Sequence, residues 1–287
     1  MKHLFFIHLF LICFSVYGQS RKCDGSVMGV YIGDEDAIPR QELFLKKKFK
    51  DLNISDENKC LTYNYQAFKE LLDSVSVIKN GKYKNDGLRI YFAVRLSPIG
   101  NQHYNKMILI FTPTINEPGS DVHSDSLSSY WIIENKSLIA INRDTARNWV
   151  KQYEDTRLKK FELGGKIVSG NTFNETKSLW YKIENLDDSN KISGLRNFIQ
   201  CLIESHKAKD ITIHFAAFAR KKEPYYQLTL VFDLNDEEYF THKLTFTHRP
   251  FFVKLANKKK PAAFYTYADT GNPCPPGVCK GTSLSRN

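Results

Sequence analysis

The sequence predicts an α+β protein made of two tandem helix–helix–β-hairpin repeats, with antiparallel sheets and their helices packed on one face. A strand, a polar loop and a second strand occur twice, at 88–93 with 107–111 and at 211–216 with 228–232. Ile211 lies 123 residues after Leu88, and Leu228 lies 121 residues after Met107, so only the loop has changed length. Similarity at a fixed offset indicates an internal duplication.

Residues 1–18 predict an export signal, with Lys2 as the positive region and 4–16 as a short apolar core. The apolar run is shorter than the roughly 20 residues needed to span a bilayer, and no later stretch is a transmembrane candidate. Cys13 lacks the small preceding residue that bacterial lipid attachment requires. We therefore expect a soluble exported protein, periplasmic or extracellular, cut before Gln19.

Composition is that of a globular protein, 42% hydrophobic and 25% charged. The formal net charge is +10, and three basic clusters contribute to it: Lys46–Lys48, Arg220–Lys222 and Lys258–Lys260. In an exported protein, such charge suits an anionic glycan, lipopolysaccharide or a membrane surface better than nucleic acid. Solvated basic faces that keep the protein soluble are the simpler explanation, and the sequence favours it.

After an N-terminal extension at 19–36, repeat A covers 37–133 and repeat B covers 134–287. Each repeat opens with Ala-Ile-x-Arg, at 37–40 and at 140–143, and a helix should follow. Pro39 suits a first helical turn, and Asn142 is a good N-cap.

Apolar residues at helical spacing predict two helices in each repeat. In repeat B the first helix has a full apolar stripe, formed by Ala146, Trp149, Val150 and Tyr153. In repeat A the corresponding stripe is thinner, formed by Leu45, Phe49 and Leu52, and the opposite face, with Lys46–Lys48, is expected to be partly a solvated surface. The second helix has an apolar stripe in both repeats. In repeat A it consists of Phe68, Leu71, Leu72 and Val75, and in repeat B of Leu195, Phe198, Ile199, Leu202 and Ile203.

Two alignments of the repeats are available ahead of the strand pair. Matching Phe68 to Phe198 sets Cys201 opposite Leu71, whereas another sets 61–63 on 179–181. Both hold if repeat B carries an insertion around 187–193.

The first strand alternates, with Leu88, Ile90 and Phe92 facing the core and Arg89 and Tyr91 facing away. Residues 107–111 are apolar on both faces, as in a central strand covered on two sides. The polar segment 116–129 is the best linker candidate.

Three motifs of the chain resemble those of small exported proteins common in Bacteroidota. They are the strand at 87–92, the pair Trp180-Tyr181, and the closing Gly-x-Pro-Cys-Pro-Pro-x-x-Cys at 271–279 with Tyr267 before it. The resemblance covers repeat B well and repeat A weakly. It implies export and no particular chemistry.

Export leaves five cysteines, an odd number, so at least one is unpaired within the chain. Cys274 and Cys279 flank a Pro-Pro-Gly turn, which predicts a local disulfide; their spacing is unlike the redox motif, and two cysteines are too few for zinc. Cys23 and Cys60 are a second candidate pair. Cys201 is the predicted free thiol.

No catalytic constellation stands out, and we expect no metal and no cofactor. The sequence has no Gly-x-Ser-x-Gly elbow and no glycine-rich phosphate loop. His242 and His248 would share a face only on one unbroken strand. His214 takes the position that Tyr91 has in repeat A, so we expect it to be a surface or interface residue and not a catalyst. Carboxylates brought together by the fold would still permit a hydrolase.

Tyrosines beside lysines at loop ends suit binding of a sugar or a protein surface, although they could equally pack the edges of a thin core. The candidate binding residues are Tyr104, Tyr225, Tyr226, Lys221, Lys222 and His214. We predict an exported non-catalytic binding or interaction protein whose partner is a protein or an anionic glycan. The alternative is a hydrolase acting on an envelope polymer, either glycan or peptidoglycan.

Overall fold

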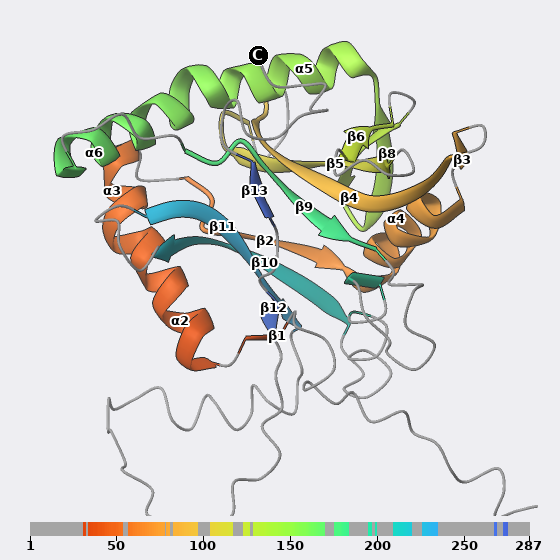
Figure 1. The fold of residues 1–287 in the computed structure, drawn as a ribbon, viewed down its shortest axis with the longest axis horizontal. Helices are drawn as coiled ribbons and strands as arrows, with labels where there is room; N and C mark the ends of the chain where they lie inside the picture. Colours follow the sequence, from red (N-terminus) through yellow and green to blue (C-terminus); the bar gives the residue numbers. More distant parts are fainter. Residues whose placement is uncertain are drawn as a thin grey trace, which may run out of the picture.

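The computed structural model describes residues 31–32, 34–53, 57–77, 79–80, 83–96, 104–116, 123–126, 129–169, 175–183, 195–196, 199, 209–219, 226–234, 267–268 and 272–274. These residues form helices and two antiparallel sheets, so the predicted α+β class is confirmed. Figure 1 shows the two sheets stacked, with the sheet that contains β4 and β5 above the one that contains β10 and β11, and a long helical segment along the outer side of the upper sheet.

Among the described residues, the first sheet has its strands in the order β1 (Tyr31–Ile32), β12 (Tyr267–Ala268), β11 (Tyr226–Leu234), β10 (Asp210–Ala219) and β2 (Cys60–Asn64). The second sheet has the order β13 (Asn272–Cys274), β9 (Ser178–Lys182), β4 (Tyr83–Val94), β5 (Met107–Asn116), β7 (Tyr130–Glu134) and β8 (Ser137–Ile141). Two short strands flank this path, β3 (Lys79–Asn80) beside β4 and β6 (His123–Asp125) beside β5.

The helices are α2 (Asp34–Leu43), α4 (Tyr65–Val77), α5 (Arg143–Tyr153) and α6 (Lys159–Ser169), with a four-residue α3 (Phe49–Leu52). A π-helical segment joins α2 to α3, and another joins α5 to α6: η2 (Phe44–Lys48) and η3 (Glu154–Leu158). Such wide turns are rare, and they occur often at functional sites.

The two strand pairs recognised in the sequence are β4–β5 and β10–β11, and their registers correspond. Phe92 pairs with Leu109 in the first hairpin, and Phe215 pairs with Leu230 in the second. These positions differ by the same 123 and 121 residues as the sequence pattern.

The strand that precedes each hairpin pairs with the other hairpin. β2 lies beside β10, with Tyr63 opposite Ile211, and β9 lies beside β4, with Tyr181 opposite Leu88. The alignment of 61–63 with 179–181 therefore places residues in equivalent registers. The sequence pattern did not indicate this exchange, because the apolar alternation of a strand identifies its buried face and not its partner.

A single core lies between the sheets and contains side chains from both hairpins, from α4 and from the π-helical segments. Phe92 and Phe215 lie near each other at its centre, with ring centroids 6.1 Å apart. Phe44 of η2 contacts Phe215, and Tyr153 at the end of α5 contacts Phe92, with centroids 5.9 and 5.7 Å apart. Each helical segment thus packs on the equivalent phenylalanine of one hairpin.

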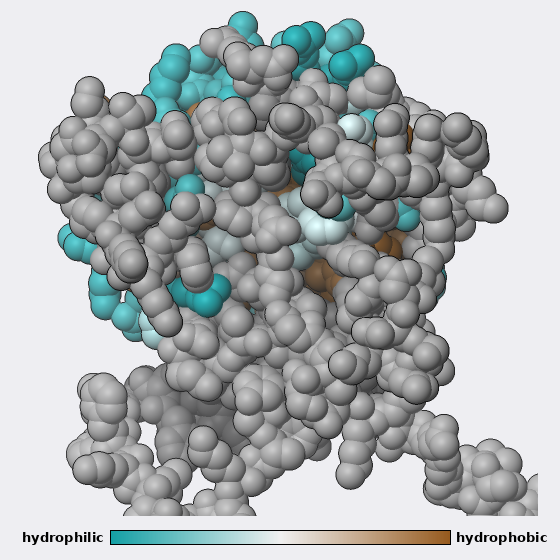
Figure 2. Space-filling view, viewed as in Figure 1, coloured by the Kyte–Doolittle hydropathy of each residue, from teal (hydrophilic) through white to brown (hydrophobic). Residues whose placement is uncertain are grey.

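The second sheet is covered on its other face by α5. Tyr91, Ile108 and Ile110 pack there against Trp149 and Val150. This confirms that 107–111 is covered on both faces and that α5 buries its predicted stripe. Asn142 is the N-cap of α5, as predicted, and its side-chain oxygen accepts from the Thr145 amide at 2.7 Å. Figure 2 shows hydrophilic residues along the helical segment at the edge of the view.

The structure differs from the sequence expectations in repeat A. The first helix begins at Asp34, so Pro39 lies inside it and not in its first turn. Leu45 is exposed and Phe44 is buried instead, because the π-helical turn shifts which residues face the core. Lys48 is also buried, so the 46–48 cluster is only partly a solvated surface.

Two further expectations need correction. Arg89 and Tyr91 are buried, since the face of β4 that was expected to be solvated is covered. The predicted linker at 116–129 contains β6, which pairs with β5, and the buried Asp125. Phe68, Leu71, Leu72 and Val75 of α4 are buried as predicted.

Candidate functional site

Two buried glutamates stand just ahead of the exchanged strands. Glu57 lies three residues before β2, and Glu175 lies three residues before β9. Their exposed fractions are 4% and 0%. A buried carboxylate must be paired and hydrogen-bonded, because the transfer of a bare charge out of water costs several kcal/mol.

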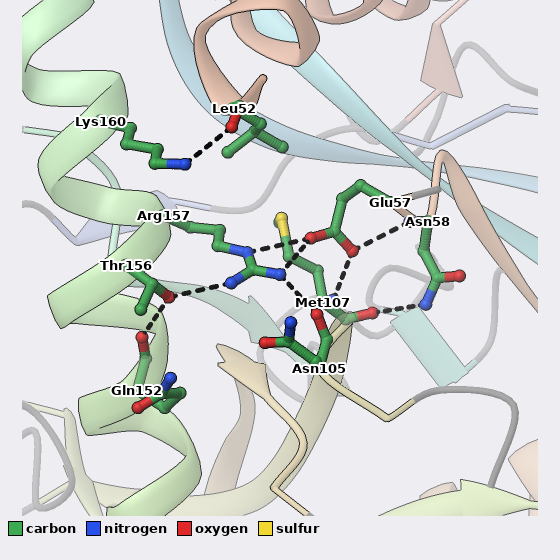
Figure 3. Close-up of polar contacts among 9 residues, drawn as sticks. All are labelled: Leu52, Glu57, Asn58, Asn105, Met107, Gln152, Thr156, Arg157 and Lys160. Atoms are coloured by element: carbon green, nitrogen blue, oxygen red, sulfur yellow. Dashed lines mark hydrogen bonds and ion pairs between the residues drawn. The ribbon is translucent and has the colours of Figure 1, made fainter. Parts of the chain in front are cut away.

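Glu57 holds together three segments of the chain (Figure 3). Its Oε1 accepts from the amides of Asn58 at 2.9 Å and Met107 at 2.6 Å. Its Oε2 accepts from Nε of Arg157 at 3.0 Å and from Nη2 at 2.9 Å. Arg157, itself in η3 and 3% exposed, also donates to the carbonyl of Asn105.

Glu175 makes the corresponding contacts on the other hairpin. Its Oε1 accepts from the amides of Thr176 at 2.8 Å and Leu228 at 2.6 Å. Its Oε2 pairs at 2.5 Å with Nζ of Lys48, which lies in η2. The segment η3 therefore supplies the cation for Glu57, which binds the β4–β5 hairpin. The segment η2 supplies the cation for Glu175, which binds the β10–β11 hairpin.

The two amides have the same place in their hairpins. Met107 is the first residue of β5 and pairs with Val94. Leu228 is the third residue of β11 and pairs with Ala217, which lies 123 positions after Val94. Tyr104 and Tyr225 each stand three residues earlier in the sequence. Both glutamates thus bind an amide near the start of a hairpin's second strand, three residues after a tyrosine.

The first of these loops has an exposed side and a fixed base. Tyr104 is 49% exposed and Leu96 is 42% exposed. The base is held by Arg95, which pairs with Glu134 at 2.8 Å and lies over the Trp149 ring. Asn105, next to Tyr104, has a left-handed φ of 54°.

Carboxylates gather around η3 and the start of β9. Glu154 pairs with Lys177 at 3.0 Å, and Glu162 accepts from the Glu175 amide at 3.4 Å. Burial raises the pKa of the Glu162 carboxyl above its ordinary value. Burial, together with these three carboxylates, raises the pKa of the Tyr153 hydroxyl, which donates to the Thr176 carbonyl at 3.0 Å.

His214 lies on the outer face of the first sheet and not at a hairpin tip. It is directly opposite Cys60 across β10 and β2, and its Nε2 lies 3.4 Å from a carboxylate oxygen of Asp233. Burial raises the pKa of the Cys60 thiol; Asp233 raises it further and Lys59 lowers it. Cys60 is a free cysteine in this structure.

A second polar cluster occupies the equivalent face of β4. Arg89 pairs with Asp125 at 3.0 Å, and the Tyr91 hydroxyl donates to the same carboxylate at 2.5 Å. Trp180 stacks on His123, with ring centroids 3.8 Å apart, and donates to Thr114 at 2.9 Å. These contacts attach β6 to the sheet.

The structure places the predicted site residues unevenly. Tyr104 is exposed beside an anchored loop base, whereas His214 is half-buried in a sheet. Tyr226 begins β11, and its side chain is outside the described part, as are all of Tyr225, Lys221 and Lys222.

The predicted cysteine pairs are largely outside the described residues. Cys274 lies in β13 opposite Ser178, but its side chain is not described; Cys279, Cys23 and Cys201 fall outside altogether. The export signal at 1–18 and the 242–248 histidine pair also lie outside.

Sequence reasoning missed Glu57 and Glu175. The available signal was that each glutamate stands four residues before an aligned segment, 61–63 or 179–181. The matched positions of Met107 and Leu228, 121 residues apart, were a second signal.

Within the described residues, no group of His, Cys, Asp and Glu side chains is arranged to hold a metal ion. No helix among them is long and apolar enough to cross a membrane. A pocket beside α4 is lined by Tyr65, Lys69, Leu72, Asp73, Arg196 and Ile199. No known family model, curated protein or solved structure matches the chain.

Proposed function

We propose that this is an exported, non-catalytic binding protein of the envelope or secreted space, and that its two hairpin loops contact the partner. The observation that carries the proposal is the pair of equivalent buried anchors. Glu57 and Glu175 each bind a backbone amide near the start of a hairpin's second strand, and a tyrosine stands three residues before each amide.

The anchors restrict how much the loop bases can move. A loop that is already ordered loses less conformational entropy when it binds, so its exposed side chains contribute more affinity. Tyrosine suits this role because its rigid ring gives a large contact area and its hydroxyl can hydrogen-bond. Two such loops on one body would allow bivalent contact with a repeating polymer or a symmetric protein surface.

The matching registers support an origin of the two halves by duplication, as the sequence pattern predicts. The basic residues of the second loop, Lys221 and Lys222, favour an anionic partner such as an acidic glycan. The export signal and the resemblance to exported Bacteroidota proteins give the proposed location.

The test is binding of the mature protein to an array that includes acidic glycans, followed by affinity measurements on the best ligand. We expect Tyr104→Ala and Tyr225→Ala each to weaken binding by roughly tenfold or more, and the double variant to weaken it further. Leu163→Ala is the control, since Leu163 is 60% exposed and belongs to α6 and not to either loop. Unchanged affinity in the double variant would refute the proposal.

A hydrolase of envelope glycan or peptidoglycan is the second candidate, and Glu162 favours it. It is a half-buried carboxyl with a raised pKa beside two other glutamates, an environment suited to a general acid. Release of soluble products from peptidoglycan by the wild-type protein, lost in Glu162→Gln, would support this alternative. Binding without product release would count against it.

A further inference from the structure

The β8 strand forms an open edge of the second sheet. It is the last strand in the sheet order, and in the part of the chain that the structure describes only β7 pairs with it. Ser137, Ile139 and Ala140 are exposed, with 37% of Ile139 accessible. Figure 1 shows β8 at the edge of the sheet, rising to the start of α5.

This edge lacks the usual protection against pairing. Natural edge strands are blunted by charged residues, prolines or bulges, and β8 has none of these in its sequence Ser-Leu-Ile-Ala-Ile. Its pairing with β7 is regular over all five residues.

The turn before β8 determines which backbone groups face outward. Asn135 and Lys136 have φ of 49° and 67°, which indicates the two-residue type I′ turn of a tight hairpin. The pair that closes such a turn, Glu134 with Ser137, exchanges hydrogen bonds, and the bonded pairs then alternate along the ladder. Leu138 and Ala140 therefore direct their N–H and C=O groups away from β7.

These two outward-facing residues are placed symmetrically about Ile139. If a second β8 lies antiparallel with Ile139 opposite Ile139, Leu138 of each copy faces Ala140 of the other. All four outward groups of each strand are then satisfied by the arrangement of an ordinary antiparallel ladder. Leucine thus faces alanine at two symmetry-related pairs, Ile139 faces Ile139 at the centre, and neither strand carries a charged side chain.

We propose that β8 is a self-association surface, through which two copies of this chain join their second sheets across a two-fold axis at Ile139. A C2 contact must be self-complementary, and this strand meets that requirement by its backbone pattern and its side chains. One five-residue strand gives a smaller contact than the 1,200–2,000 Å² that is roughly typical of stable complexes, so the dimer should depend on concentration.

The test is sedimentation equilibrium of the mature protein over a wide concentration range. Ile139→Lys brings two like charges together on the axis and should weaken the dimer by at least about tenfold. Ile139→Glu should do the same, and an equimolar mixture of the two variants should dimerise again. Leu163→Lys, at another exposed apolar site, should dimerise like the wild type.

Ala140→Pro gives an independent variant, because it removes an outward N–H and leaves the β7 ladder intact. Circular dichroism and thermal melting would confirm that each variant is folded. A wild type that is monomeric at every concentration, a dimer unaffected by Ile139→Lys, or a mixture of the two charged variants that stays monomeric would each overturn the proposal. Capture of an extended peptide by β8 in a protein that remains monomeric would also overturn it.

Discussion

Replacing Glu57 by glutamine should destabilise the protein strongly, although the two side chains have nearly the same volume. The amide oxygen can still accept from Asn58 and Met107, but the negative charge opposite Arg157 is lost. Arg157 is 3% exposed, so its charge would remain buried without a counter-ion. Removal of one partner from a buried pair costs about 3–5 kcal/mol.

The expected loss is a large part of the total stability of a domain, which is about 5–15 kcal/mol. Urea denaturation measures it, as a lower midpoint at an unchanged slope. In the double variant Glu57→Gln, Arg157→Met, both charges are gone, so the combined loss should be smaller than the sum of the single losses.

The matched control is an ion pair of similar length on the surface. Lys46 and Glu42 are 2.7 Å apart, with side-chain exposures of 67% and 54%. Lys46→Met should change the free energy of unfolding by less than about 1 kcal/mol, because water screens an exposed pair. If Glu57→Gln has an effect as small as Lys46→Met, the anchor does not hold the loop as we infer.

Three further results are expected. Because a raised carboxyl pKa in the folded state favours the protonated form, stability should fall as pH rises through the pKa of Glu162, and Glu162→Gln should show less of this fall in urea denaturation at successive pH values; an identical pH profile would contradict it. Asp233→Asn should shift the alkylation of Cys60, followed by peptide mass spectrometry, to lower pH, since Asp233 raises the thiol pKa; an unchanged rate profile would contradict it. Lys136→Gly should stabilise the protein by about 0.5–1 kcal/mol in thermal unfolding, since Lys136 has a left-handed φ, and a loss of stability would argue against the type I′ turn.

The sequence predicted the elements that are determined locally. The stripe of α4, the N-cap at Asn142 and the core face formed by Leu88, Ile90 and Phe92 depend on the spacing of a few residues, and the structure has them as expected. The start of the first helix was wrong because Pro39 is tolerated inside it. The two π-helical turns were not foreseen, and this is why Leu45 was taken for a core residue in place of Phe44.

Long-range pairing could not be predicted in the same way. Nothing in residues 60–64 indicates that they lie beside β10 rather than beside β4, since both strands have the same apolar alternation. The anchors were missed for the same reason. Glu57 and Arg157 are 100 residues apart, and a single glutamate in a polar stretch is ordinarily a surface residue.

We infer that the two halves of the chain fold as one body, in which each glutamate binds the hairpin of its own half and pairs with a cation from the other half. The direct measurement is to introduce a specific protease site between residues 117 and 122, cleave the folded protein and examine it by native gel filtration. We predict that the two fragments stay together and separate only in denaturant, because β2 pairs with β10 and β9 pairs with β4. Two folded fragments that elute separately without denaturant would contradict the exchange of strands and, with it, the common anchoring of the loops.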